Sequence, residues 1–114
     1  MCKINVIESN AFVGITEFLY FIDCNIGYIQ SNSIVISNDS TYENRNVYGF
    51  YQSHNNITYL DSEYFAILKN SKIRFMNFVN SYVNECHANA FEYANETYVD
   101  AVDIHLNVFK KIVT

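Results

Sequence analysis

Apolar residues in the second half of the chain recur every three or four positions. From Phe75 to Cys86 they fall at i, i+3, i+4, i+7, i+8 and i+11, which would place them on one side of a helix. A second run with similar spacing extends from Phe91 to Ile112. This period is typical of amphipathic helices rather than of strands, whose side chains alternate between two faces. The pattern therefore predicts a helical second half.

The two apolar runs are predicted to be separate helices. At about 100° per residue, the stripe of the first run is rotated by roughly 110° from that of the second, so one straight helix could not bury both. Asn89, followed three residues later by Glu92, is typical of an N-cap with a capping-box acid. We expect one helix to start near Ser71, a break at residues 87–89, and a second helix to reach the C-terminus. The core residues predicted on the second helix are Val102, Phe109 and Ile112.

The first half favours β-strands, because short β-branched and aromatic runs are separated by polar turns. The predicted strands cover residues 3–7, 17–22, 26–30, 33–37, 46–52 and 57–60. "SHNN", at residues 53–56, is expected to close a hairpin between the last two strands. A short helix is expected at residues 61–70. In an alternative interpretation, residues 11–23 form an additional helix, since their apolar positions also fit a helical period.

These elements predict an α+β fold, in which an antiparallel sheet from the N-terminal half packs against the C-terminal helices. A length of 114 residues suits one core, so residues 1–114 are expected to form a single globular domain. The most apolar stretch, residues 12–29, is interrupted by Glu17 and Asp23, so no membrane span is expected. The first ten residues lack the long apolar run of a secretory signal. We therefore expect a cytoplasmic protein, of a bacterial cell or an infected host cell.

The charge balance indicates the kind of partner. Twelve Asp and Glu residues outnumber seven Lys and Arg, for a net charge of −5 at pH 7. Asn, Ile, Tyr and Phe are abundant, a bias typical of AT-rich coding in viruses and mobile genetic islands, yet Lys is scarce. An acidic chain is poorly suited to phosphate contacts with DNA or RNA. The scarcity of Lys is explained either by solubility or by a basic protein partner.

An acidic row is predicted on the last helix. With helical spacing, its four carboxylates fall within about 80° of arc opposite the apolar face. No Lys or Arg lies among them to relieve their repulsion, which costs about 0.2–0.5 kcal/mol per pair. The row is either a solvated face or a ridge that docks a basic surface. Its members are Glu92, Glu96, Asp100 and Asp103.

A second candidate binding region is the polar stretch at residues 37–56. It combines tyrosine rings with Asn and Ser side chains, which is the chemistry that binding loops favour, because Tyr offers a large contact area at low entropic cost. Alternate tyrosines of a strand here could instead face the core. The candidate contact residues are Tyr42, Glu43, Tyr48 and Tyr51.

No catalytic or metal-binding signature is found. Cys2, Cys24 and Cys86 are odd in number and widely spaced, which favours free thiols, and neither the cysteines nor the histidines have ligand spacing. No cofactor is expected. The leading hypothesis is a small acidic inhibitor that is not an enzyme and occludes a basic toxin, nuclease or nucleic-acid-binding effector. It would be a toxin-immunity (antitoxin) protein or a phage anti-restriction or anti-CRISPR protein. The alternative is a small α+β enzyme or ligand-binding domain with a cavity between sheet and helices.

Overall fold

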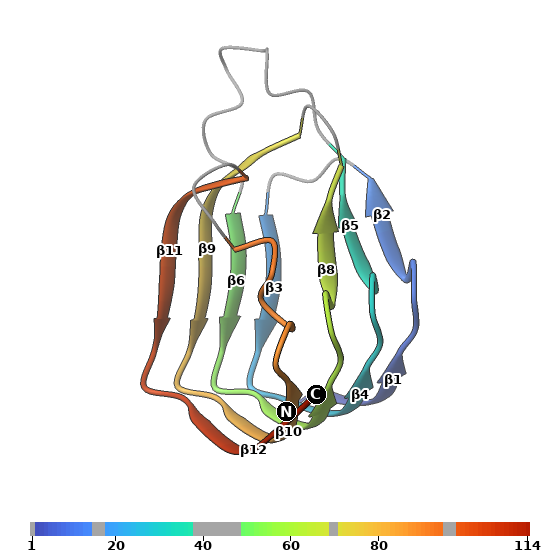
Figure 1. Ribbon diagram of the computed structural model, residues 1–114, viewed down its shortest axis with the longest axis vertical. Helices are drawn as coiled ribbons and strands as arrows, with labels where there is room; N and C mark the ends of the chain where they lie inside the picture. The colour runs from blue at the N-terminus through green and yellow to red at the C-terminus, as the bar shows by residue number, and fades with distance from the viewer. Residues whose placement is uncertain (1, 15–17, 38–48, 69–70, 95–97) are drawn as a thin grey trace.

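The chain winds into a parallel β-solenoid of about four turns (Figure 1). The computed structural model describes residues 2–14, 18–37, 49–68, 71–94 and 98–114. Within these ranges there is no helix, and hence none that could cross a bilayer. The predicted α+β fold with C-terminal helices is therefore wrong, and so are the short helix at 61–70 and the alternative helix at 11–23.

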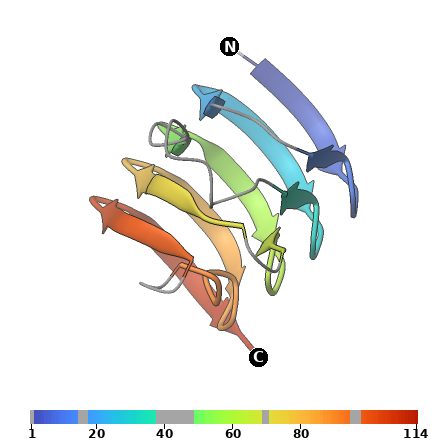
Figure 2. The same cartoon turned by 90° about the horizontal axis from the view of Figure 1, so that it is seen from above.

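Three sheets form the walls of the solenoid, and the chain passes through them in the order A, B, C, except that in the fourth turn the described residues go from sheet A to sheet C without a strand in sheet B. Sheet A consists of β1 (Cys2–Ile7), β4 (Cys24–Ile29), β7 (Asn56–Leu60), β10 (Tyr82–His87) and β12 (Val108–Val113). Sheet B consists of β2 (Phe12–Gly14), β5 (Ile34–Ile36) and β8 (Phe65–Ile67). Sheet C consists of β3 (Phe18–Ile22), β6 (Gly49–Ser53), β9 (Ile73–Val79) and β11 (Val99–His105). Every pairing among these strands is parallel, and Figure 2 shows the N- and C-termini at opposite ends of the stack.

Most of the predicted strands are confirmed, but not their pairing. Those at 3–7, 26–30, 33–37 and 57–60 match β1, β4, β5 and β7 to within two residues. Residues 18–22 of the strand predicted at 17–22 form β3, and residues 49–52 of the one predicted at 46–52 lie in β6; residue 17 and residues 46–48 lie outside the described residues. The expected hairpin at "SHNN" is wrong, because it is a corner at which the chain passes from sheet C to sheet A.

The helical period of the second half has a β-structural origin. In sheet A, buried side chains lie three residues apart rather than two, as in the pairs Val83 with Cys86 and Ile57 with Leu60. Two consecutive residues between each pair face outward, so a single strand reproduces the i, i+3 spacing of a helix. The run from Phe75 to Cys86 then continues through a corner from β9 into β10, which extends the apparent period.

The corners are built from residues in the left-handed region. Asn10, Asp23, Asn32, His54, Glu63, Asn80 and Leu106 all have φ between 46° and 61°, and each lies at a corner. Asn and Asp adopt this conformation more readily than most other residues with a side chain, which accounts for four of the seven.

A ladder of hydrogen bonds runs along the corner between sheets C and A. The Cys24 N–H donates to Asn55 Oδ1 (3.0 Å), the Asn55 N–H donates to Ser81 Oγ (3.1 Å), and the Ser81 N–H donates to Asn107 Oδ1 (2.9 Å). Asn55 Nδ2 also donates to the carbonyl of Phe21 (2.8 Å). We call Cys24, Asn55, Ser81 and Asn107 the corner ladder. Because its side chains replace water as partners for backbone groups, the chain can bend inside the solenoid without leaving them unsatisfied.

Aliphatic and aromatic side chains fill the interior. Phe50, Tyr64 and Phe65 are almost completely buried, and their rings contact one another edge-on or tilted. Phe78 is equally buried, and its ring meets that of Phe91 edge-on. The three core residues predicted in the last segment fare differently. Phe109 is half-buried, with its ring centroid 6.1 Å from that of Phe78, but Val102 is 42% exposed and Ile112 is 56% exposed. The prediction that Val102 and Ile112 are core residues is wrong, because both lie in the last described turn, which no further strand covers.

Candidate functional site

Four aromatic side chains gather on the outer face of sheet C. Residues 19, 21, 50, 76 and 78 point into the core, so their neighbours point outward. The centroids of Tyr20 and Tyr51 lie 5.0 Å apart with nearly parallel rings, at 11°, and the ring of Phe18 lies 5.9 Å from that of Tyr20. Phe75 continues the group, 5.3 Å from Tyr51. We call Phe18, Tyr20, Tyr51 and Phe75 the aromatic platform.

Strand register explains how the platform is assembled. Tyr20 pairs with Tyr51 across β3 and β6, while Phe18 and Phe75 both pair with Gly49. A Cβ atom at Gly49 would lie 2.3 Å from Cε2 of Tyr51, so the Tyr51 ring folds back over the glycine. The absence of a side chain at this one position lets the ring bridge the phenylalanines on either side.

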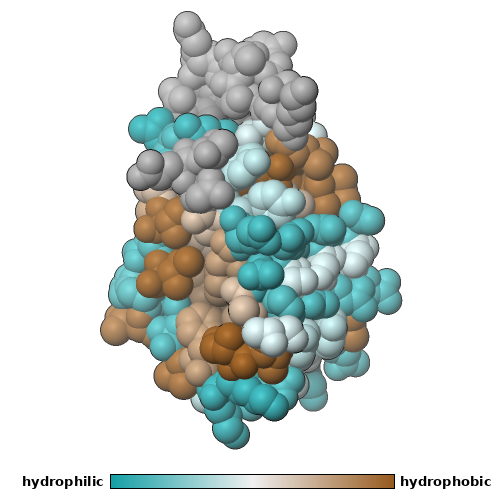
Figure 3. All heavy atoms as spheres, viewed as in Figure 1, coloured by the Kyte–Doolittle hydropathy of each residue, from teal (hydrophilic) through white to brown (hydrophobic). Residues whose placement is uncertain are grey.

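The platform is accessible. Tyr20 is 54% exposed and Phe18 is 40% exposed, while Tyr51 and Phe75 are half-buried. Among the described residues, neither tyrosine hydroxyl has a hydrogen-bond partner. Aromatic rings exposed together on one face of a strand array are uncommon in a protein surface and often mark a binding site. Figure 3 shows that apolar residues, in brown, reach the surface at several places on the face seen in Figure 1.

A second stacked tyrosine pair has a different environment. Tyr28 and Tyr59 stack on the outer face of sheet A, with centroids 4.7 Å apart, but the Tyr28 hydroxyl donates to Asp61 Oδ2 (3.1 Å). Burial, and then this hydrogen bond with the Asp61 carboxylate, raises the pKa of Tyr28 above its usual value. Both rings of this pair are half-buried. A hydrogen bond to Asp61 thus holds this pair in place, whereas the hydroxyls of Tyr20 and Tyr51 have no such partner among the described residues.

Polar groups continue the tyrosine row of sheet C. Asn77 on β9 pairs with Tyr51, and Asp103 on β11 pairs with Asn77. Strands in a sheet are about 4.8 Å apart, so the Asp103 position lies about 10 Å from that of Tyr51 along the row. The Asp103 carboxylate contacts His105 Nδ1, which leaves it 44% exposed. Stacking surface and carboxylate thus share one face.

The predicted acidic row does not exist as a row. Asp100 and Asp103 lie on β11, where Asp100 forms an ion pair with Lys72 Nζ (2.5 Å), and Glu92 lies in a turn. The arrangement failed because it required a helix. Glu96 lies outside the described residues, as do Tyr42, Glu43 and Tyr48. Of the predicted contact residues, Tyr51 belongs to the platform.

Sequence reasoning missed Phe18, Tyr20 and Phe75. The signal available was alternation: in "FLYFI", Phe18 and Tyr20 lie two residues apart, which predicts that both face the same side of one strand. Their convergence depends on the pairing of β3 with β6, which lie 31 residues apart in register.

The buried thiols are poor nucleophiles. Burial raises the pKa of Cys86 to about 11, and burial together with the adjacent Cys2 thiol raises the pKa of Cys24 to about 11, so both stay protonated at neutral pH. Cys2 is half-buried, and all three cysteines are free thiols. Within the described ranges, no three His, Cys, Asp or Glu side chains cluster as metal ligands would.

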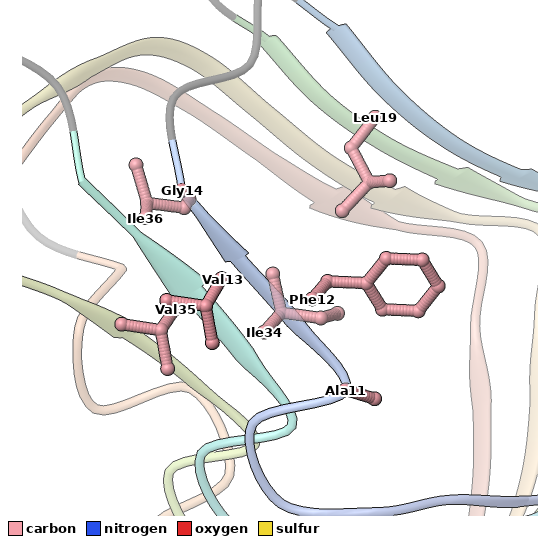
Figure 4. A pocket seen from close by; sticks show the side chains of 8 residues that line it. All are labelled: Ala11, Phe12, Val13, Gly14, Leu19, Ile34, Val35 and Ile36. Atoms are coloured by element: carbon pink, nitrogen blue, oxygen red, sulfur yellow. The ribbon is translucent and has the colours of Figure 1, made fainter.

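An apolar hollow of about 270 Å³ opens on the first turns, between β2, β5 and β3 (Figure 4). The figure shows only carbon atoms in its lining side chains, which include Phe12, Leu19 and Ile34. A ligand site needs a few placed polar groups to orient its occupant, and this lining supplies none. The cavity of the alternative hypothesis required helices, which the described residues lack.

The outer face of sheet C is therefore the strongest candidate site. Its exposed rings can stack against a flat group, and the carboxylate of Asp103 can pair with a cation. Comparison with protein-family models, with curated proteins and with solved structures finds no match to the chain.

Proposed function

We propose that the protein is a binding protein, and that the outer face of sheet C receives a basic segment of a partner protein. The observation that supports this is the stacked, exposed Tyr20–Tyr51 pair in line with Asp103. An arginine guanidinium is planar and packs well against tyrosine rings, and any basic side chain can pair with a carboxylate. A basic segment laid along the row could place one arginine on the platform and a second basic side chain beside Asp103, two strands further along.

The charge of the chain supports the same choice of partner. A net charge of −5 attracts a basic surface and speeds its encounter, and it opposes binding of nucleic acid through phosphates. Tyrosines are enriched among the residues that dominate binding energy, because a rigid ring buries a large area. By covering a basic surface, such as that of a toxin, a nuclease or another nucleic-acid-binding effector, the protein would block access to it.

The test uses short blocked peptides of one design, in which glycine alternates with arginine, lysine or glutamate. Binding is followed through the aromatic NMR signals of ¹³C-labelled protein. We expect the arginine peptide to shift the Tyr20 and Tyr51 ring signals, the lysine peptide to bind more weakly, and the glutamate peptide not to bind. Tyr51→Ala should abolish most of the arginine response. Tyr59→Ala is the matched control, since it removes one ring from the stacked pair on sheet A.

Three results would contradict the proposal. One is equal loss of binding in Tyr51→Ala and Tyr59→Ala. Another is an arginine response confined to residues outside sheet C. The third is binding of a neutral oligosaccharide at the same rings with no preference for arginine, which would make the platform a sugar site.

A further inference from the structure

The last described turn exposes side chains that other turns bury. Val102 continues the inward row of Leu19, Phe50 and Met76, and Ile112 continues that of Ile29, Leu60 and Cys86. With the other exposed aliphatic residues of this turn, they form a strip along β11, the corner and β12. We call it the terminal strip: Val102, Ile104, Leu106, Val108 and Ile112, all 38% exposed or more. Its backbone edge is also open, since β11 and β12 are edge strands of the described sheets.

Charges on this edge are divided between its two arms. β11 carries Asp100 and Asp103, whose side chains are 49% and 44% exposed. β12 carries Lys110 and Lys111, both exposed. One arm is therefore acidic and the other basic, on either side of the corner at residues 106–107.

A two-fold axis through this corner makes the edge complementary to itself. β11 runs toward the corner and β12 runs away from it. A second copy turned over by 180° about the corner therefore lays its β12 along β11 of the first, antiparallel, and its β11 along β12. Each acidic arm then meets a basic arm, and the two terminal strips face each other. Such an isologous contact uses one patch twice and closes after two copies.

A head-to-tail stack fits less well. Sheet A has five strands, sheet C has four and sheet B has three. Pairing β12 with β1 of a following copy would leave sheets B and C unpaired at the junction, with buried backbone groups unsatisfied.

We propose that the 114-residue chain forms a two-fold dimer through antiparallel pairing of the β11–β12 edges. An open strand edge is a template for pairing, and the opposed charges of the two arms select this partner and orientation. The dimer also covers aliphatic side chains that the solenoid otherwise leaves in water.

The experiment is a charge swap, followed by sedimentation equilibrium over a range of protein concentrations without any ligand. Asp103→Lys gives β11 an exposed lysine that faces the lysines of β12 in the second copy, and it leaves the Lys72–Asp100 ion pair in place. Lys110→Glu gives β12 a glutamate that faces the acids of β11 in the second copy, and it leaves Lys111 beside Glu85. We expect the wild type to dimerise, and each variant alone to have a dimer dissociation constant raised about tenfold or more. An equimolar mixture should recover dimerisation, because one contact of the mixed dimer is then the same as in the wild type and the other sets the new lysine of β11 against the new glutamate of β12.

The matched control is Val13→Lys, at an exposed aliphatic residue on β2 at the opposite end of the solenoid. It should leave the dissociation constant unchanged. Thermal melts identify any variant that fails to fold, and the wild-type dimer should in any case weaken as salt is added. A wild type that stays monomeric, a mixture no tighter than its components, or an equal effect of Val13→Lys would overturn the proposal. None of these results depends on ligand binding at the aromatic platform.

Discussion

Replacing Asn55 by alanine is expected to be among the most destabilising single changes at a polar residue of this protein. Asn55 is 3% exposed, and its side-chain amide accepts from the Cys24 N–H and donates to the Phe21 carbonyl. Alanine leaves both backbone groups without these partners inside the corner. Each unsatisfied buried group costs about 1–3 kcal/mol, so the free energy of unfolding should fall by about 2–6 kcal/mol. Total stabilities are typically about 5–15 kcal/mol, so this loss would be large.

The assay is urea denaturation followed by far-ultraviolet circular dichroism. Asn56→Ala is the control, because Asn56 is the next residue along the chain but is exposed on the outer face of β7. It should change stability by less than about 0.5 kcal/mol. Asn55 itself does not have a positive φ, so alanine adds no backbone strain there. If Asn55→Ala loses less than about 1 kcal/mol, or no more than Asn56→Ala, the corner ladder is not a main source of stability.

Three further changes test other features. Leu106→Asn should raise the free energy of unfolding by about 1 kcal/mol, because Leu106 has φ 57° and asparagine tolerates this region better than leucine. Urea denaturation measures this change. Gly49→Ala should push the Tyr51 ring off the platform, which weakens binding of the arginine peptide and shifts the Tyr51 ring signals. A hydrogen bond with the Glu92 carboxyl, and then burial, raises the pKa of Glu63. The folded state therefore binds more protons than the unfolded state, and this contribution to stability is lost as pH rises through the raised pKa. Glu63→Gln should consequently raise the melting temperature more at neutral pH than in acid, and equal gains at both would contradict this.

The sequence predicted local structure better than architecture. Strands of the first half were found because their β-branched runs are bounded by polar turns. Helices were wrongly predicted in the second half of the chain, because pairs of buried residues such as Val83 and Cys86 reproduce helical spacing within a strand. A pattern of apolar residues records which side chains are buried, but not whether a helix or a strand buries them.

The solenoid was hidden because its turns differ in length. Paired positions in sheet A are 22 residues apart between β1 and β4, 31 between β4 and β7, and 26 in the next two turns. In the three turns with a strand in sheet B, the connection from sheet A to sheet B has four residues, whereas those from B to C have three, twelve and five. The large differences in turn length therefore arise at the corner between sheets B and C. Because of them, the sequence does not repeat at a fixed period.

The candidate site could be predicted only in part. Tyr51 was identified by composition, since tyrosines in a polar stretch favour binding. Phe18 and Tyr20 could not be joined to it, because strand pairing between distant segments is a tertiary property. The acidic residues Asp100 and Asp103 were identified, but on the wrong element, so their geometry was wrong.

The aromatic platform runs along the solenoid axis, so it draws its rings from three successive turns. In a solenoid, each turn is held mainly by its neighbours, and an end turn opens more readily than a middle one. Phe18 and Tyr20 belong to the first turn, Tyr51 to the second and Phe75 to the third. An occupant that touches all three would bind only when they are folded together, and would hold the first turn closed in proportion to its own affinity. Binding at the platform and opening of the first turn would thus be linked, because the partner binds only the folded form of that turn. A core substitution in the first turn could therefore weaken binding even though it lies outside the contact with the partner.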